Sequence, residues 1–215
     1  MKKNFPDAVN EINQNCAVWM TYTAFNKKIK CAREHLNELK EIELELPTLT
    51  KNLNLGKLDN DETGKTVDAY YKNLVPCIVE IKAAIECLKL CLAIKYADET
   101  YFKWEDTLSK IYNALSVPID QLADIESNIK DLRNFLVHAG SPLFTFNNTK
   151  LKFTVPKYNR LHLKLTIPTI KKGKLEIVDL LETALKRMEE FSKHLEKKHE
   201  FFIIDKTEIS EDWSK

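Results

Sequence analysis

The sequence predicts a mainly α protein, a bundle of four to five long helices with a small antiparallel β-hairpin before the last helix. Two observations support this fold class. The 215 residues include only 4 glycines, as expected when most of the backbone is helical. Apolar residues recur at steps of three and four along most of the chain. We therefore expect one domain over residues 1–215, with the hairpin inserted at about residues 143–170.

The first half of the chain predicts two long helices joined by a loop. Pro6 suits a first helical position, and an apolar stripe then runs toward Pro47, where we expect the helix to end. The stripe contains Val9, Ile12, Cys16, Trp19, Tyr22, Phe25, Ile29, Ala32, Leu36 and Leu39. We predict a loop over residues 47–65 and a second helix over about residues 67–95, interrupted or begun at Pro76.

The second half predicts three more helices and a change of period. We expect helices over about residues 100–115, from Asp120 to the stop at Gly140-Ser141-Pro142, and over about residues 175–202. The inward face of the last helix is Ile177, Leu181, Leu185, Met188, Phe191 and Leu195. Before it, residues 151–155 and 161–167 alternate apolar with polar side chains, which predicts a hairpin turning over residues 156–160. Residues 143–146 are a candidate third strand beside this hairpin.

The charge is unevenly distributed on a chain of net charge +1. No acidic residue lies between Asp131 and Glu176, whereas basic residues are frequent there. A basic segment on a near-neutral protein favours a polyanionic partner, and a solvated lysine face is the alternative explanation. The residues we expect to contact RNA phosphates are Lys150, Lys152, Lys157, Arg160 and Lys164.

Cysteine and histidine usage gives no sign of a metal or another cofactor. The cysteines form no CxxC pair and lie in apolar helical stretches, which favours free thiols in a reducing, cytoplasmic compartment. Glu190 with His194, and Glu196 with His199, fall on one predicted helix, too few elements for a helical-bundle metal site. We also expect no signal peptide and no membrane-spanning segment.

The candidate active site is at the end of the helix that starts near Asp120. Ile125, Ile129, Leu132 and Leu136 form its apolar stripe, while Asn134 and His138 lie on the opposite side and Arg133 projects between the two faces. Arginine binds phosphate through paired hydrogen bonds, and histidine transfers protons near neutral pH. These residues suit phosphodiester cleavage. The alternative is that Arg133 and His138 merely cap the helix C-terminus.

The run Arg133-Asn134-Phe135-Leu136-Val137-His138 resembles the signature of the HEPN superfamily (higher eukaryotes and prokaryotes nucleotide-binding domains). That signature is an arginine, usually followed by a polar residue, and a histidine after a short gap, placed late on a helix of an all-α bundle. The hairpin is not part of the minimal family pattern. The resemblance therefore implies a stand-alone bacterial-type member with an added β-hairpin.

The resemblance also implies an activity, because many family members are metal-independent ribonucleases that work as homodimers. By this analogy His138 is the general base or acid, Arg133 binds the scissile phosphate, and Asn134 orients the histidine or contacts a phosphate oxygen. The implied partners are RNA, a second copy of the chain and, in a toxin or defence role, a cognate antitoxin. Other members are non-catalytic nucleotide- or RNA-binding interaction modules, and this alternative stays open.

Overall fold

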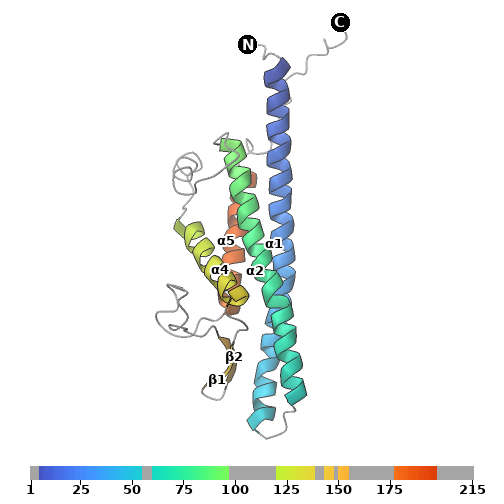
Figure 1. Ribbon diagram of the computed structural model, residues 1–215, viewed down its shortest axis with the longest axis vertical. Helices are drawn as coiled ribbons and strands as arrows, with labels where there is room; N and C mark the ends of the chain where they lie inside the picture. The colour runs from blue at the N-terminus through green and yellow to red at the C-terminus, as the bar shows by residue number, and fades with distance from the viewer. Residues whose placement is uncertain are drawn as a thin grey trace.

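A computed structural model describes residues 5–54, 60–96, 120–138, 143–147, 150–154 and 177–197. Its elements are α1 (Phe5–Asn54), α2 (Asn60–Tyr96), α4 (Asp120–His138), β1 (Leu143–Asn147), β2 (Lys150–Thr154) and α5 (Ile177–Lys197). The two longest helices, α1 and α2, lie side by side and antiparallel (Figure 1). The helix predicted at about residues 100–115 lies outside the described residues. Among the helices described, none is long and apolar enough to cross a membrane.

An apolar seam holds α1 against α2. Its largest side chains are almost wholly buried: Phe25, Leu36, Leu39, Tyr70, Leu74, Ile78 and Ile81. Two cysteine thiols lie against the backbone of α1, where Cys77 donates to the carbonyl of Ala32 at 3.4 Å and Cys91 to that of Val18 at 3.6 Å. A buried thiol behaves as a small apolar group. These two positions therefore allow the helices to approach closely.

The helix ends differ from the prediction. α1 continues through Pro47, and α2 begins before residue 65 and contains Pro76, so most of the predicted loop over residues 47–65 is helical. Proline inside a helix costs roughly 3 kcal/mol. Beside Pro47, however, Leu46 is buried and Leu49 packs against the core. Tertiary burial of these side chains offsets the local penalty, and the helix does not end.

The apolar stripe of α1 is confirmed from Tyr22 to Leu39 but is wrong at Cys16 and Trp19. Both of these side chains are exposed, Trp19 to 59%. The seam instead uses Val18, which is 2% exposed and whose backbone carbonyl accepts the hydrogen bond from the Cys91 thiol. Successive helical residues are about 100° apart. Burying Val18 therefore turns Trp19 away from α2.

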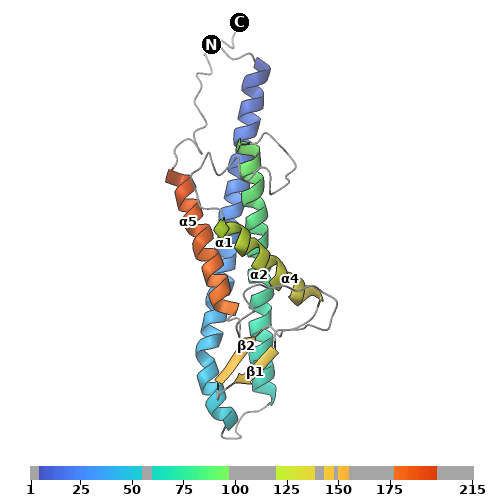
Figure 2. The ribbon, with the colours of Figure 1, turned by 90° about the vertical axis from the view of Figure 1, so that its left-hand side faces the viewer.

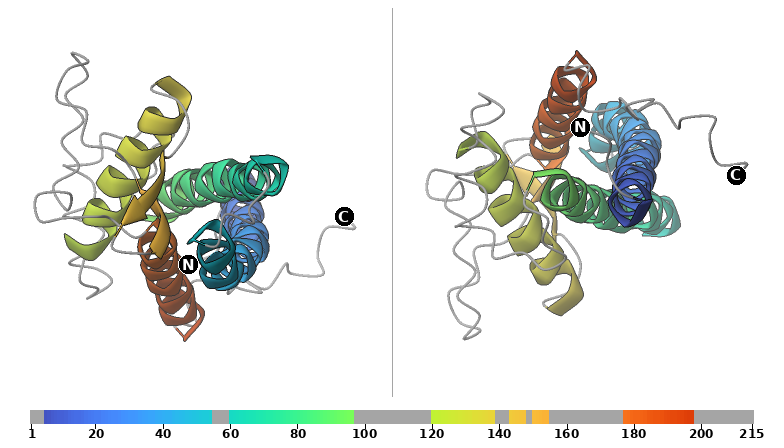
Figure 3. Two further views of the ribbon diagram at one scale, coloured as in Figure 1. Left: turned by 90° about the horizontal axis from the view of Figure 1, so that it is seen from below. Right: turned by 90° about the horizontal axis from the view of Figure 1, so that it is seen from above.

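The two shorter helices pack mainly on different long helices. α5 lies against α1, and α4 crosses α2 (Figure 2). Seen along the long axis from either end, the C-terminal end of α4 points away from α5 (Figure 3). The predicted inward face of α5 is confirmed, since all its members are buried: Ile177, Leu181, Leu185, Met188, Phe191 and Leu195.

The predicted fold class is wrong. With 50 and 37 residues, α1 and α2 form a long helical hairpin that carries two shorter helices in the described part, rather than a bundle of four to five long helices. In the described part, β2 pairs antiparallel with β1 and lies against α1, so the hairpin described joins residues 143–147 to residues 150–154 and not residues 151–155 to 161–167. Only Asn148 and Thr149 separate β1 from β2 in the sequence, and so short a connection favours this pairing. Residues 161–167 lie outside the described residues.

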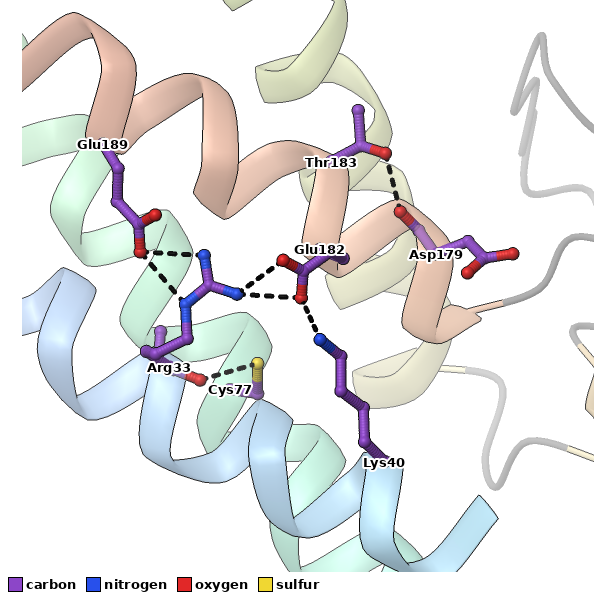
Figure 4. Close-up of polar contacts among 8 residues, drawn as sticks. Arg33, Lys40, Cys77, Asp179, Glu182, Thr183 and Glu189 are labelled. Atoms are coloured by element: carbon purple, nitrogen blue, oxygen red, sulfur yellow. Dashed lines mark hydrogen bonds and ion pairs between the residues drawn. The ribbon is translucent and has the colours of Figure 1, made fainter. Parts of the chain in front are cut away.

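A charged cluster, which we call the α5 clasp, joins α5 to α1 (Figure 4). The guanidinium of Arg33 donates to the Glu182 carboxylate at 2.8 Å and to the Glu189 carboxylate at 2.8 and 3.0 Å. Lys40 also pairs with Glu182. Two glutamates seven residues apart lie two turns apart on one face of a helix, so Arg33 reaches both. Arginine held in this forked manner fixes the geometry of the pair.

Acid should weaken the α5 clasp. Burial raises the pKa of Glu182, but its ion pairs with Lys40 and Arg33 outweigh this and hold its pKa below the ordinary 4.5. A carboxylate with a lowered pKa in the folded state stabilises the fold above its unfolded pKa, and the stabilisation disappears as the pH falls through the folded pKa. We expect the urea midpoint of Glu182→Gln to fall less than that of the wild type between about pH 6 and pH 3.

The matched control for this measurement is Glu190→Gln, which removes an exposed carboxylate from the same helix. It should follow the wild-type pH profile. Equal slopes for the wild type and Glu182→Gln would show that the α5 clasp does not contribute to acid sensitivity.

Candidate active site at the end of α4

The helix that carries the motif has the limits and the buried face predicted from the sequence. α4 begins at Asp120 and ends at His138, just before the Gly140-Ser141-Pro142 stop. Its apolar stripe is buried, at no more than 5% exposure for every member: Ile125, Ile129, Leu132 and Leu136. This stripe sets the rotation of α4 and determines which residues face away from the core.

Arg133 lies on the outward side of α4. Its side chain is exposed, while Asn134 is half-buried and the preceding Leu132 is wholly buried. Arg133 Nη1 donates to Asn134 Oδ1 at 3.4 Å, which is long for a hydrogen bond. No carboxylate pairs with Arg133 among the described residues. Its guanidinium is therefore held loosely and can bind an anion, unlike that of Arg33 in the α5 clasp.

His138 is the last residue of α4. Its backbone lies four residues, about 6 Å along the helix axis, beyond Asn134, while its side chain lies outside the described part. Residues four apart share a helix face, so the motif occupies one turn at the helix end.

The charges beside the motif change sign at Asp131. Burial raises the pKa of this carboxyl group, and nearby Lys130 opposes the rise. In the sequence Asp131 is also the last acidic residue before Glu176. A phosphate at Arg133 would therefore meet little negative charge from the chain that directly follows it.

Of the predicted RNA-contacting residues, only two lie on a described element. Lys150 pairs with Asn147 and Lys152 with Thr145 on the β1–β2 ladder, and their side chains lie outside the described part. The remaining three lie outside the described residues altogether: Lys157, Arg160 and Lys164. That these lysines and this arginine form one surface with Arg133 stays a prediction.

Comparison with known proteins adds nothing to this geometry. No family model, curated protein or solved structure matches the chain. The likeness to the HEPN superfamily thus depends on the motif from Arg133 to His138 and on its place at the end of a helix.

The described residues also bear on thiol and metal chemistry. Burial raises the pKa of Cys77 to about 12 and that of Cys91 to about 11, so both remain thiols at neutral pH and are poor nucleophiles. No group of three or more metal-ligating side chains gathers within the described ranges. Glu196 instead accepts a hydrogen bond from the Tyr22 hydroxyl at 3.1 Å, and His199 lies outside these ranges.

A second charged cluster, which we call the α4 clasp, holds α4 on α2. The sequence alone did not predict it. The Glu126 carboxylate pairs with Lys89 and, at 3.4 Å, with Lys82. The side chains of Lys89 and Glu126 are only 12% and 15% exposed. The available signal was the position of Glu126 at the edge of the apolar stripe, directly after Ile125.

Proposed function

We propose that this protein is a metal-independent endoribonuclease with its active site at the C-terminal end of α4. The observation that supports the proposal is the exposed guanidinium of Arg133, contacted only by Asn134 among the described residues, one turn before the helix ends at His138. Arginine and histidine at this spacing supply charge stabilisation and proton transfer without a metal ion.

The proposed reaction is attack of the ribose 2′-hydroxyl on the adjacent phosphorus. One His138 imidazole accepts the 2′-hydroxyl proton, the new O–P bond forms, and the bond from phosphorus to the 5′-oxygen breaks. A second imidazolium gives its proton to that leaving oxygen, which yields a 2′,3′-cyclic phosphate and a 5′-hydroxyl. Arg133 stabilises the negative charge that accumulates on the phosphate oxygens.

Asn134 has a defined part in this scheme. Its Oδ1 accepts the hydrogen bond from Arg133, and this leaves its amide N–H groups to donate. They can bind a phosphate oxygen or the imidazole. Asn134 thereby links the phosphate-binding residue to the proton-transfer residue.

The reaction needs two proton-transfer groups, and the motif supplies one histidine per chain. We therefore propose a two-fold symmetric homodimer in which the two α4 ends face each other. The direction of α4 supports this, because its C-terminal end points away from α5 (Figures 2 and 3). The family resemblance supports a toxin or defence role with an antitoxin as partner. The free cysteines support a cytoplasmic location, because disulfides are rare in reducing compartments.

The test is incubation of the purified protein with generic RNA in EDTA. We expect fragments with 2′,3′-cyclic phosphate ends, because no metal ion takes part and the 2′-oxygen is the nucleophile. DNA of the same sequence should survive, and a single 2′-deoxynucleotide at a mapped cleavage site should block cutting there. Activity that disappears in EDTA and returns with a divalent ion would contradict the proposal.

A non-catalytic interaction module is the second candidate, and exposed apolar side chains on the long helices favour it. Trp19 is 59% and Met20 64% exposed on α1, and Leu90 is 42% exposed on α2. Large exposed apolar groups can mark partner-binding surfaces. Intact RNA in the EDTA assay, together with RNA binding that depends on Arg133, would favour this candidate over the nuclease.

A further inference from the structure

α4 brings Arg133 to the surface as part of a short helix that must be held in place. Its apolar stripe packs on the rest of the core, but apolar contacts are non-directional. Apolar contacts determine how deeply a helix is buried, but they constrain its sliding along the axis and its rotation less strictly. A directional contact helps to fix the position of the last turn, and the α4 clasp is such a contact between α4 and α2.

The burial of the α4 clasp makes it sensitive to the loss of either charge. Both ion pairs of Glu126 go through Oε1, while Oε2 is buried without a hydrogen-bond partner among the described residues. Separating Glu126 from Lys89 would leave a buried, unpaired carboxylate. Breaking a buried pair in this way is far more costly than breaking an exposed one.

The same lysines have a second carboxylate partner on their own helix. Glu86 pairs with Lys82 and, at 3.6 Å, with Lys89, and its side chain is 55% exposed. Glu86 and Lys89 both belong to α2 and cannot tether α4. Glu86 is therefore a natural control for Glu126, with the same charge and the same partners but no link between helices.

The α4 clasp is correctly placed to act on the motif. Glu126 precedes Arg133 by seven residues, about two turns or 10 Å along the axis and on nearly the same helix face. α4 crosses α2 where the clasp holds it, and the motif end continues beyond this crossing (Figure 2). A turn or slide of α4 at the clasp would thus be carried to Arg133.

We propose that Glu126 is a positioning residue, whose ion pairs with Lys89 and Lys82 fix α4 on α2 and thereby place Arg133 and Asn134. The catalytic consequence rests on the proposed ribonuclease function, whereas the clamping of α4 does not. The two parts are tested by different measurements on the full chain.

Clamping is tested by amide hydrogen exchange in Glu126→Gln, with Glu86→Gln as the control. In Glu126→Gln the amides of α4 should exchange about tenfold faster or more, because a buried ion pair is lost. The amides of α5 should be unaffected, and Glu86→Gln should leave α4 as in the wild type. Unchanged exchange of α4 in Glu126→Gln would overturn the inference.

Two further variants keep the test decisive. If Glu126→Gln does not fold, Lys82→Gln removes the longer ion pair of Glu126 and leaves its pair with Lys89. The pair of Lys82 with Glu86 is lost too, but it lies within α2 and does not tether α4. Exchange of the α4 amides should then rise about two- to fivefold. The charge swap Glu126→Lys with Lys89→Glu should restore the protection of α4 that either single change removes. Absence of this rescue would show that packing, and not the ion pair, holds the helix.

Positioning is tested by RNA cleavage. Glu126→Gln should lower kcat about ten- to a hundredfold with KM nearly unchanged, because small displacements of catalytic groups impair the chemical step. The charge swap should recover most of the rate. A normal kcat despite a loosened α4 would overturn the positioning role. A wild-type protein that does not cleave RNA would instead refute the proposed function, and the exchange result would still decide whether Glu126 clamps α4.

Discussion

Arg133→Ala and His138→Ala should each abolish RNA cleavage while leaving the fold intact. Loss of a group that stabilises transition-state charge costs about 10²–10³-fold in kcat, and loss of a proton-transfer group costs about 10²–10⁴-fold. Arg133 is exposed, so its removal should change the free energy of unfolding by no more than about 0.5 kcal/mol. Initial cleavage rates on end-labelled RNA and urea unfolding curves measure both effects.

Lys130→Ala is the matched control, since it removes an exposed cation one turn earlier on α4 and should keep most of the activity. Mixing the two inactive variants tests the shared site. If each active site takes residues from both chains, Arg133→Ala mixed with His138→Ala should recover part of the rate. Unfolding of His138→Ala would show that His138 is structural and would contradict its catalytic role.

Leu132→Ala should produce the largest loss of stability on α4. Leu132 is wholly buried among the apolar residues that α4 contributes to the core. Truncating a buried leucine removes apolar contacts and leaves a cavity, at a cost of about 2–5 kcal/mol. The urea midpoint should fall accordingly.

Arg133→Ala, one residue further on, serves as the control for Leu132→Ala. Leu132→Ala should lower the stability of the fold, whereas Arg133→Ala should lower the rate of RNA cleavage. A change of less than about 1 kcal/mol for Leu132→Ala would mean that the face of α4 assigned to the core is not tightly packed.

The sequence predicted those parts of the fold that depend on local periodicity. The inward faces of α4 and α5 are confirmed, as are the limits of α4, because an amphipathic helix presents its core residues at fixed spacing whatever it packs against. The helix ends near Pro47 and Pro76 could not be predicted in this way. There the local penalty of proline competes with burial contributed by another helix.

Strand pairing and the two charged clasps could not be predicted from the sequence either, because they too depend on contacts between separate segments. The alternation in residues 151–155 is compatible with a partner on either side, and the partner observed is β1. The lysine and glutamate of the α4 clasp are 37 residues apart, and Arg33 and Glu182 of the α5 clasp are 149 apart. A charged residue at the edge of an apolar stripe gives no indication of a partner at such distances.

Arg133 and Arg33 show what the sequence determines and what only the tertiary structure determines. The sequence by itself determined that Arg133, Asn134 and His138 share the end of one helix, because their spacing fixes this as soon as the segment is helical. Only the tertiary structure decided which of these two arginines is paired with carboxylates. Arg33 is held by two carboxylates of α5, whereas Arg133 meets only Asn134 among the described residues. The physical reason is that a guanidinium is neutralised by whatever the fold brings beside it, and this depends on packing between distant segments.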